Sequence, residues 1–145
     1  MKSFIFTSII LLTGLSAFAD INGFWQGTGQ WSYDGNQTEC NKVTFAFAET
    51  DSAFIRKNGH LECDAIVLEM PDLKLEKSGS ELILNNKKIG KFSENDYSWV
   101  ETFDENIKIH INIHRDGDHF DYTEQWLISE TSLFYEITAR VFIQN

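Results

Sequence analysis

Alternation of apolar and polar residues is clearest between Ile107 and Ile128. Asp116-Gly117 divides this stretch into two alternating runs, which is typical of a β-hairpin, because a type I′ turn needs positive φ at both central residues. With these residues at the centre of the turn, Ile109 pairs with Glu124. The predicted hairpin has an apolar face formed by Ile107, Ile109, Ile111, Ile113, Phe120, Tyr122, Trp126 and Ile128. The carboxylate of Glu124 interrupts this face, and a charge there is costly unless it is paired or solvated.

Strand signals of the same kind cover most of the remaining chain. The predicted strands are 23–33, 42–49, 52–57, 60–69, 72–77, 81–85, 87–93, 96–103, 107–115, 118–128 and 132–143. Many short strands joined by tight turns, without a long amphipathic helix, are typical of an antiparallel meander. Closure removes the exposed edges of such a meander, so the sequence predicts an all-β, up-and-down antiparallel barrel of roughly 8–10 strands. A two-sheet β-sandwich is the alternative.

The strands on either side of the hairpin extend its inward face. A three-residue loop pairs Glu101 with Ile109, and the last strand places Ile137 beside Glu124. Glu101, Ile109 and Glu124 are therefore expected in one row. The two carboxylates are then roughly 9–10 Å apart in a flat sheet.

Aromatic residues flank both glutamates of this row, two positions away along each strand. Aromatic walls with a few polar groups are typical of a small-molecule site. The predicted ligand-binding residues are Trp25, Tyr97, Trp99, Glu101, Ile109, Tyr122, Glu124, Trp126 and Tyr135. Two other interpretations stay open. The glutamates could act as general acid and base, since their separation is near that of inverting glycoside hydrolases, or they could lie at a wet barrel mouth or pair with Lys88 or Arg56.

The opening strand carries the motif Gly23-x-Trp25. Followed by a meander, this motif resembles the calycin group, which includes the lipocalins and the fatty-acid-binding proteins. The resemblance implies a central cavity for a small apolar ligand. It also implies that Trp25 plugs the closed end of the barrel beneath an arginine from the last strands. Arg140 is the arginine of the last strand, but the predicted register points it outward, opposite Asp121.

The N-terminal segment has the pattern of an export signal. Lys2 precedes an apolar run from Phe4 to Leu15, and Ala17-Phe18-Ala19 has the small-x-small form of a cleavage site. We expect a signal peptide at 1–19 and a single β-barrel domain at 20–145, periplasmic or secreted. The apolar run is too short for a comfortable membrane span, so no membrane association is expected after cleavage. The formal net charge of −10 also argues against nucleic acid as a partner.

Cys40 and Cys63 are the only cysteines. In an oxidising compartment two cysteines favour one disulfide. Tight turns at Thr50-Asp51 and Asn58-Gly59, however, would place Cys40 roughly 20 Å along the strand from the row of Cys63. That separation is too large for a disulfide. A disulfide and two free thiols therefore both stay open.

The histidines of the hairpin are expected outside the barrel. His114 and His119 face each other across the predicted turn, with aspartates nearby, and such a pairing can hold a divalent metal. They alternate with the isoleucines, however, and so point outward. A nucleophile elbow, a phosphate-binding glycine loop and a His-Glu-x-x-His motif are not in the sequence. The sequence therefore predicts no metal site, no cofactor and no catalytic residue.

These observations favour an exported, lipocalin-like binding protein with an aromatic cavity. The expected partner is a small apolar or amphipathic molecule, and the oligomeric state stays open. The first alternative is an enzyme on the same scaffold that uses Glu101 and Glu124 as acid and base. The second is an acidic, exported interaction protein with a filled core.

Overall fold

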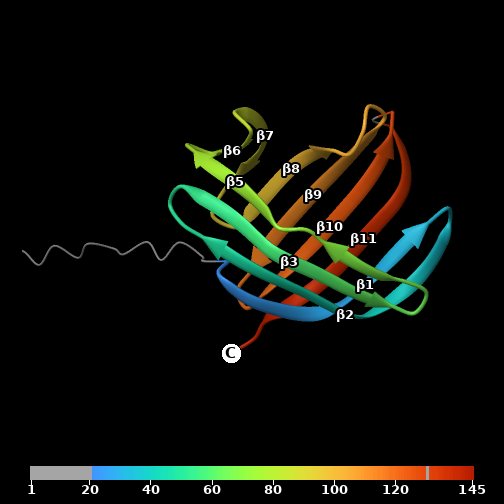
Figure 1. Cartoon of the computed structure of the whole chain (residues 1–145). Helices are drawn as coiled ribbons and strands as arrows, with labels where there is room; N and C mark the ends of the chain where they lie inside the picture. Colours follow the sequence, from blue (N-terminus) through green and yellow to red (C-terminus); the bar gives the residue numbers. More distant parts are fainter. Residues whose placement is uncertain (1–20, 130) are drawn as a thin grey trace, which may run out of the picture.

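The computed structural model describes residues 21–145 except residue 130, so the signal peptide expected at 1–19 lies outside the described residues. Eleven strands and no helix make up the described chain (Figure 1). The strands are β1 (Gly23–Tyr33), β2 (Asn36–Glu49), β3 (Ala53–Cys63), β4 (Val67–Met70), β5 (Leu73–Ser78), β6 (Glu81–Leu84), β7 (Lys87–Phe92), β8 (Asp96–Thr102), β9 (Ile107–Asp116), β10 (His119–Ile128) and β11 (Ser132–Ile143). No described segment is a helix of the length and apolarity needed to cross a membrane.

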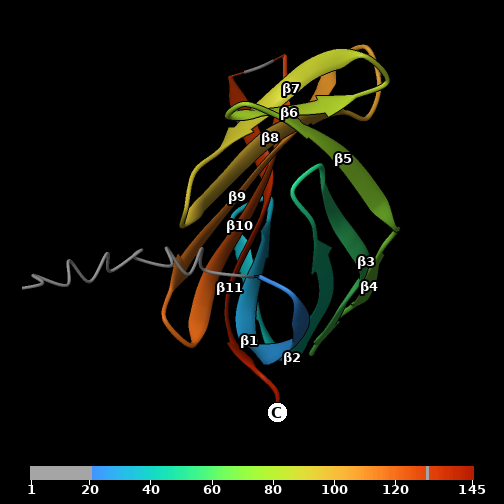
Figure 2. The same ribbon diagram turned by 90° about the vertical axis from the view of Figure 1, so that its left-hand side faces the viewer.

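All strands but β4 join into one antiparallel ring. Strands β5 to β11 pair in chain order, and β11 pairs with β1, β1 with β2, β2 with β3, and β3 with β5. The remaining strand, β4, pairs with the second half of β3 and lies beside the ring. Figure 2 shows an uneven ring, with β8–β11 and β1 in one curved wall and β2, β3 and β5 facing it. The predicted meander closing into a barrel is confirmed.

Antiparallel pairing sorts the turns onto two ends of the barrel. The turns after β2, β5, β7 and β9 lie at the same end as both ends of the described chain. We call this end the terminal end. The turns after β1, β8 and β10 lie at the other end, which we call the far end (Figure 1).

The hairpin of β9 and β10 keeps the predicted faces but not the predicted register. The turn consists of Gly117-Asp118, so pairing centred on Asp116-Gly117 is wrong by two residues. Gly117 has a φ of 64°. Asp118 is not among the described residues with positive φ, and positive φ at the first central residue alone is the pattern of a type II′ turn, which needs glycine there. A slip of two residues leaves each side chain on its own face, so the apolar face survives.

The strand β3 passes straight through Asn58-Gly59, where the sequence pattern predicted a turn. A Cβ added at Gly59 would lie 2.9 Å from the Sδ of Met70, so the glycine serves close packing. Because β3 continues to Cys63, its pairing with β2 reaches Cys40, and the two cysteines form a disulfide with an S–S distance of 2.05 Å. The distance argument against a disulfide fails because it assumed the turn.

Trp25 is fully buried at the terminal end. Its indole Nε1–H donates a hydrogen bond to the backbone oxygen of Ile21 at 2.9 Å. The guanidinium of Arg115 lies 5.6 Å from the centre of the ring, within the range of a cation–π contact. The resemblance implied that an arginine of the last strands packs on Trp25, but Arg140 lies outside the barrel. It forms a bidentate ion pair with Asp121 at 2.7 and 2.8 Å, as the predicted register of the last strand implied.

Candidate functional site

The predicted site residues occupy two parts of the molecule. Trp25 and Tyr97 lie at the terminal end, as the strand directions require. The other seven lie in the middle of the barrel and toward its far end: Trp99, Glu101, Ile109, Tyr122, Glu124, Trp126 and Tyr135. The structure therefore brings seven of the nine predicted residues together and places Trp25 and Tyr97 apart from them.

Glu124 is a buried carboxylate, with 7% of the residue exposed. Its Oε2 accepts a hydrogen bond from the hydroxyl of Tyr122 at 2.6 Å, and its Oε1 accepts one from the indole Nε1–H of Trp126 at 2.6 Å. Burial, and then the charge of Glu124, raise the pKa of Tyr122 well above its ordinary value, so the phenol stays a donor. Neutral donors therefore satisfy both oxygens of this carboxylate.

Glu101 is not in the same row as Glu124. Glu101 pairs with Ile109 as predicted, but the shifted hairpin pairs Glu124 with Ile111, so the predicted single row is wrong. The Oε1 of Glu101 accepts a hydrogen bond from the indole Nε1–H of Trp99 at 2.8 Å. Each glutamate is thus held by a tryptophan of its own strand, two positions away.

Neither predicted cation pairs with these glutamates. Lys88 forms its ion pair with Glu81. Arg56 is buried, with 3% exposed, and its Nε–H donates to the backbone oxygen of Pro71 at 3.2 Å. Glu101 and Glu124 therefore accept hydrogen bonds from neutral groups, while the charge of the buried Arg56 still acts on Tyr122, where it opposes the rise in pKa that burial causes.

Side chains pack tightly around this interior set. Phe45 lies with its ring centre 4.7 Å from that of Tyr122, and the ring of Phe54 lies 5.0 Å from Tyr97 and 5.6 Å from Trp99. Neither Glu101 nor Glu124 lines any of four pockets that open to solvent on the described residues. Ligand binding by the seven interior residues stays a prediction.

One cavity of about 540 Å³ lies at the terminal end of the barrel. It is formed by the segment before β1 and by the turns after β2, β5 and β7, and we call it the rim cavity. Its lining residues are Asn22, Glu49, Thr50, Asp51, Lys77, Gly79, Ser80, Phe92, Ser93, Glu94 and Tyr97. Tyr97 is the one predicted site residue among them.

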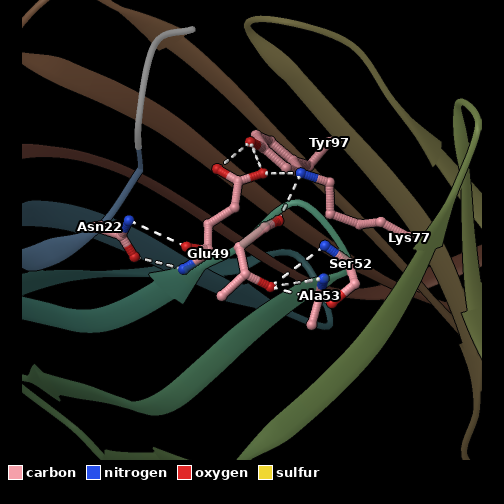
Figure 3. A network of polar contacts seen from close by, with 7 residues as sticks. Asn22, Glu49, Ser52, Ala53, Lys77 and Tyr97 are labelled. Atoms are coloured by element: carbon pink, nitrogen blue, oxygen red, sulfur yellow. Dashed lines mark hydrogen bonds and ion pairs between the residues drawn. The ribbon is translucent and has the colours of Figure 1, made fainter.

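An ion pair shielded from solvent lines the rim cavity (Figure 3). The Nζ of Lys77 lies 2.7 Å from Oε1 of Glu49, and each side chain is only 11% exposed. The hydroxyl of Tyr97 lies 2.7 and 2.8 Å from the two oxygens of the same carboxylate. A shielded ion pair is stable only when further hydrogen bonds complete it, and Tyr97 supplies one.

The backbone around Glu49 is held by its neighbours. The side-chain amide of Asn22 donates to the backbone oxygen of Glu49 at 3.2 Å, and its oxygen accepts from the backbone N–H of Glu49 (Figure 3). The hydroxyl of Thr50 accepts from the backbone N–H groups of Ser52 and Ala53 at 3.3 and 3.1 Å, which shapes the turn after β2. The carboxylate of Glu49 is therefore presented by a fixed frame.

Sequence reasoning did not find Glu49, Lys77 or Phe92 as site residues. Each lies at the end of a strand beside a predicted turn. Such positions look like ordinary solvent-facing strand ends until the meander closes. The available signal was topological: alternate turns of a meander meet at the same end, so charged and aromatic residues next to them are neighbours.

The outer histidines pair differently in the sheet than the predicted register has them. His119 pairs with Asp116 in the sheet, not with His114. His114 lies with Nδ1 2.7 Å from Oδ1 of Asp96, and this hydrogen bond raises the pKa of the histidine. Within residues 21–129 and 131–145, no group of three or more histidine, cysteine, aspartate or glutamate side chains has the arrangement needed to hold a metal ion.

Comparison with known proteins finds relatives in structure only. No family model and no curated protein matches the sequence. The S-type phycobiliprotein lyase CPES from Guillardia theta is similar in structure, with a TM-score of 0.60 and 10% identity over 88% of this chain and 90% of that chain. A DUF3598-family protein of unknown function from Nostoc punctiforme PCC 73102 has a TM-score of 0.59 and 8% identity, over 86% of this chain and 48% of that one. These likenesses show a shared fold.

Proposed function

We propose that this protein is an exported, calycin-like binding protein that holds a small molecule in the rim cavity. The observation that carries the proposal is a cavity of about 540 Å³ beside the shielded ion pair of Glu49 and Lys77. Small-molecule sites are typically concavities of ~300–1,000 Å³ with mostly apolar walls and a few placed polar groups. Export rests on the signal pattern of residues 1–19.

The walls of the rim cavity suit an amphipathic molecule. The rings of Phe92 and Tyr97 are nearly parallel, with an interplanar angle of 15° and centres 6.2 Å apart. They supply apolar surface, while Glu49, Lys77 and the hydroxyl of Tyr97 supply charge and hydrogen bonds. A ligand with an apolar body and one polar group matches this division.

The fold neighbours support binding only in a general way. One neighbour is named a phycobiliprotein lyase, and a shared barrel does not transfer a reaction, because function belongs to sites rather than folds. The acid–base alternative is less well supported than binding, because Glu101 and Glu124 are already engaged by Trp99, Tyr122 and Trp126.

Filling the rim cavity tests the proposal. Ser80 is exposed and lies between the rim cavity and a neighbouring pocket beside β7, so Ser80→Trp should block both while leaving the barrel intact. We expect N-phenyl-1-naphthylamine, an apolar fluorescent probe, to bind this variant at least tenfold more weakly than the unmodified protein. Ser132→Trp, at an exposed position of the far end, is the matched control and should bind normally.

Native mass spectrometry supplies the second measurement. Protein purified from its own host should carry a small molecule that Ser80→Trp loses and Ser132→Trp keeps. Equal retention by both variants would place the site outside the rim cavity, and the absence of any bound molecule or probe would refute the binding function.

A further inference from the structure

The rim cavity already holds an ammonium group, that of Lys77. Its Nζ lies 2.7 Å from Oε1 of Glu49, 3.1 Å from the backbone oxygen of Thr50 and 4.6 Å from the centre of the Phe92 ring. A carboxylate, a carbonyl and an aromatic face are all groups that bind an ammonium ion. We call these three groups the ammonium cradle.

We propose that the rim cavity recognises its ligand by a primary ammonium group, and that Lys77 occupies the ammonium cradle as an internal stand-in when the ligand is absent. The inference deepens the proposed function and rests on it. The ligand class is an organic amine in its protonated form, with an apolar body against Phe92 and Tyr97.

Exchange of one ammonium for another conserves the charge of the site. Glu49 is only 11% exposed, so a neutral ligand that displaced Lys77 would leave this carboxylate without a countercharge. Removing one partner of a shielded ion pair is strongly destabilising. An amine replaces the lost attraction, while Lys77 regains hydration outside the cavity. A neutral molecule can therefore bind only in the part of the cavity that leaves Lys77 in place, whereas an amine can also take the ammonium cradle.

Lys77 is suited to leave the ammonium cradle. It lies next to the last residue of β5, and its ammonium sits on a flexible four-carbon stem. Exchange then requires rotation about side-chain bonds and no change in the barrel. The stem also explains how one position can alternate between the cavity and solvent.

The charge of the cavity lining favours cations. Asp51 and Glu94 line the same cavity as Glu49, whereas Lys77 is the one cation among the lining residues of the described chain. Such an excess of negative charge raises the local concentration of cations and repels anions. The excess agrees with the class of ligand that the ammonium cradle selects.

Chemical rescue tests this inference. The variant Lys77→Met removes the ammonium group and leaves the ammonium cradle, including the carboxylate of Glu49, without a cation. We expect its melting temperature to fall, and n-propylamine at neutral pH to restore it by several degrees with a saturable dose dependence. The same concentration of 1-propanol should restore nothing. In Lys77→Met/Glu49→Gln the rescue should disappear, because the carboxylate is gone.

The affinity for n-propylamine should be at least tenfold higher in Lys77→Met than in the unmodified protein, because the internal competitor is absent. Should the variant not fold, the unmodified protein carries the test: the ε-CH₂ signal of Lys77, labelled with ¹³C, should shift saturably with n-propylamine and not with 1-propanol.

The outcomes separate this inference from the proposed function. No response to the amine, together with normal binding of N-phenyl-1-naphthylamine, would overturn the amine class and leave the binding function standing. Equal rescue by 1-propanol would also overturn it. Failure of the amine and of the probe would refute both.

Discussion

Glu124 in the barrel interior and Glu49 at the rim are both carboxylates shielded from solvent, yet their surroundings differ. Glu124 is satisfied by a phenol and an indole, and packed rings surround it. Glu49 is satisfied by a phenol and an ammonium, and a cavity of about 540 Å³ opens beside it. A shielded charge by itself is therefore no sign of a binding site. Space beside the charge, and a partner that can be exchanged, make the difference.

Removing the interior carboxylate should have the largest effect on stability. Glu124→Leu leaves the indole N–H of Trp126 without its acceptor and the hydroxyl of Tyr122 with only the Sδ of Met70, at 3.6 Å, which costs about 3 kcal/mol of the free energy of unfolding. Urea unfolding measures this loss. Glu124→Gln keeps an acceptor oxygen and should lose less. Binding of N-phenyl-1-naphthylamine should not change in Glu124→Gln; weaker binding there would place the ligand in the interior and reverse the comparison.

Glu49→Gln should lower the free energy of unfolding less than Glu124→Leu does, and it should weaken ligand binding more. It leaves the ammonium of Lys77 without a countercharge, but the lysine can turn toward solvent, so we expect a loss of about 1–2 kcal/mol in urea unfolding. Binding of n-propylamine should be lost. The control is Glu62→Gln, which breaks an exposed ion pair with Lys42 and should change neither quantity measurably. Retained amine binding in Glu49→Gln would remove the contrast with Glu124.

The smallest expected effect is a pH dependence of stability that arises on the outer face of the barrel, at His114. The hydrogen bond with Asp96 raises the pKa of His114 above 6.5. A raised folded-state pKa means that the stabilisation is fully present below the unfolded-state value and is lost as pH rises through the folded-state value. Stability should therefore fall slightly as pH rises from about 6.5. The hydrogen bond with Glu69 raises the pKa of His60 as well, so His114→Asn should reduce this dependence and leave the part that belongs to His60. NMR titration of the histidine ring and urea unfolding at several pH values measure it. An unchanged dependence in the variant would assign it to another group, such as His60.

The apolar faces of the second half were predictable because the side-chain period of a strand is two. A register error of two residues in the hairpin of β9 and β10 left Tyr122 and Glu124 facing inward. The same error put Glu101 and Glu124 in one row, because rows depend on the turn type as well as on the period. Alternation therefore predicts which face a residue occupies more securely than which residue lies beside it.

The alternation pattern of a single strand does not predict the rim cavity. Glu49, Lys77 and Tyr97 come from β2, β5 and β8, and each is unremarkable in its own strand. Tyr97 was predicted because it alternates with Trp99, whereas the ends of β2 and β5 carried no such pattern. Contacts across 28 and 48 positions of the chain join these residues.

By itself the sequence determined most of the strand content and the inward faces of the second half, and it favoured a closed meander over a sandwich, because these follow from local alternation and from the need to remove exposed edges. Tertiary structure alone decided the disulfide between Cys40 and Cys63, since β3 continues through Gly59 and its pairing with β2 brings Cys63 opposite Cys40. It alone also decided that the turns of the terminal end enclose Glu49 and Lys77 beside a cavity. Both depend on where distant segments meet once the ring closes, and the period of a single strand does not contain that information.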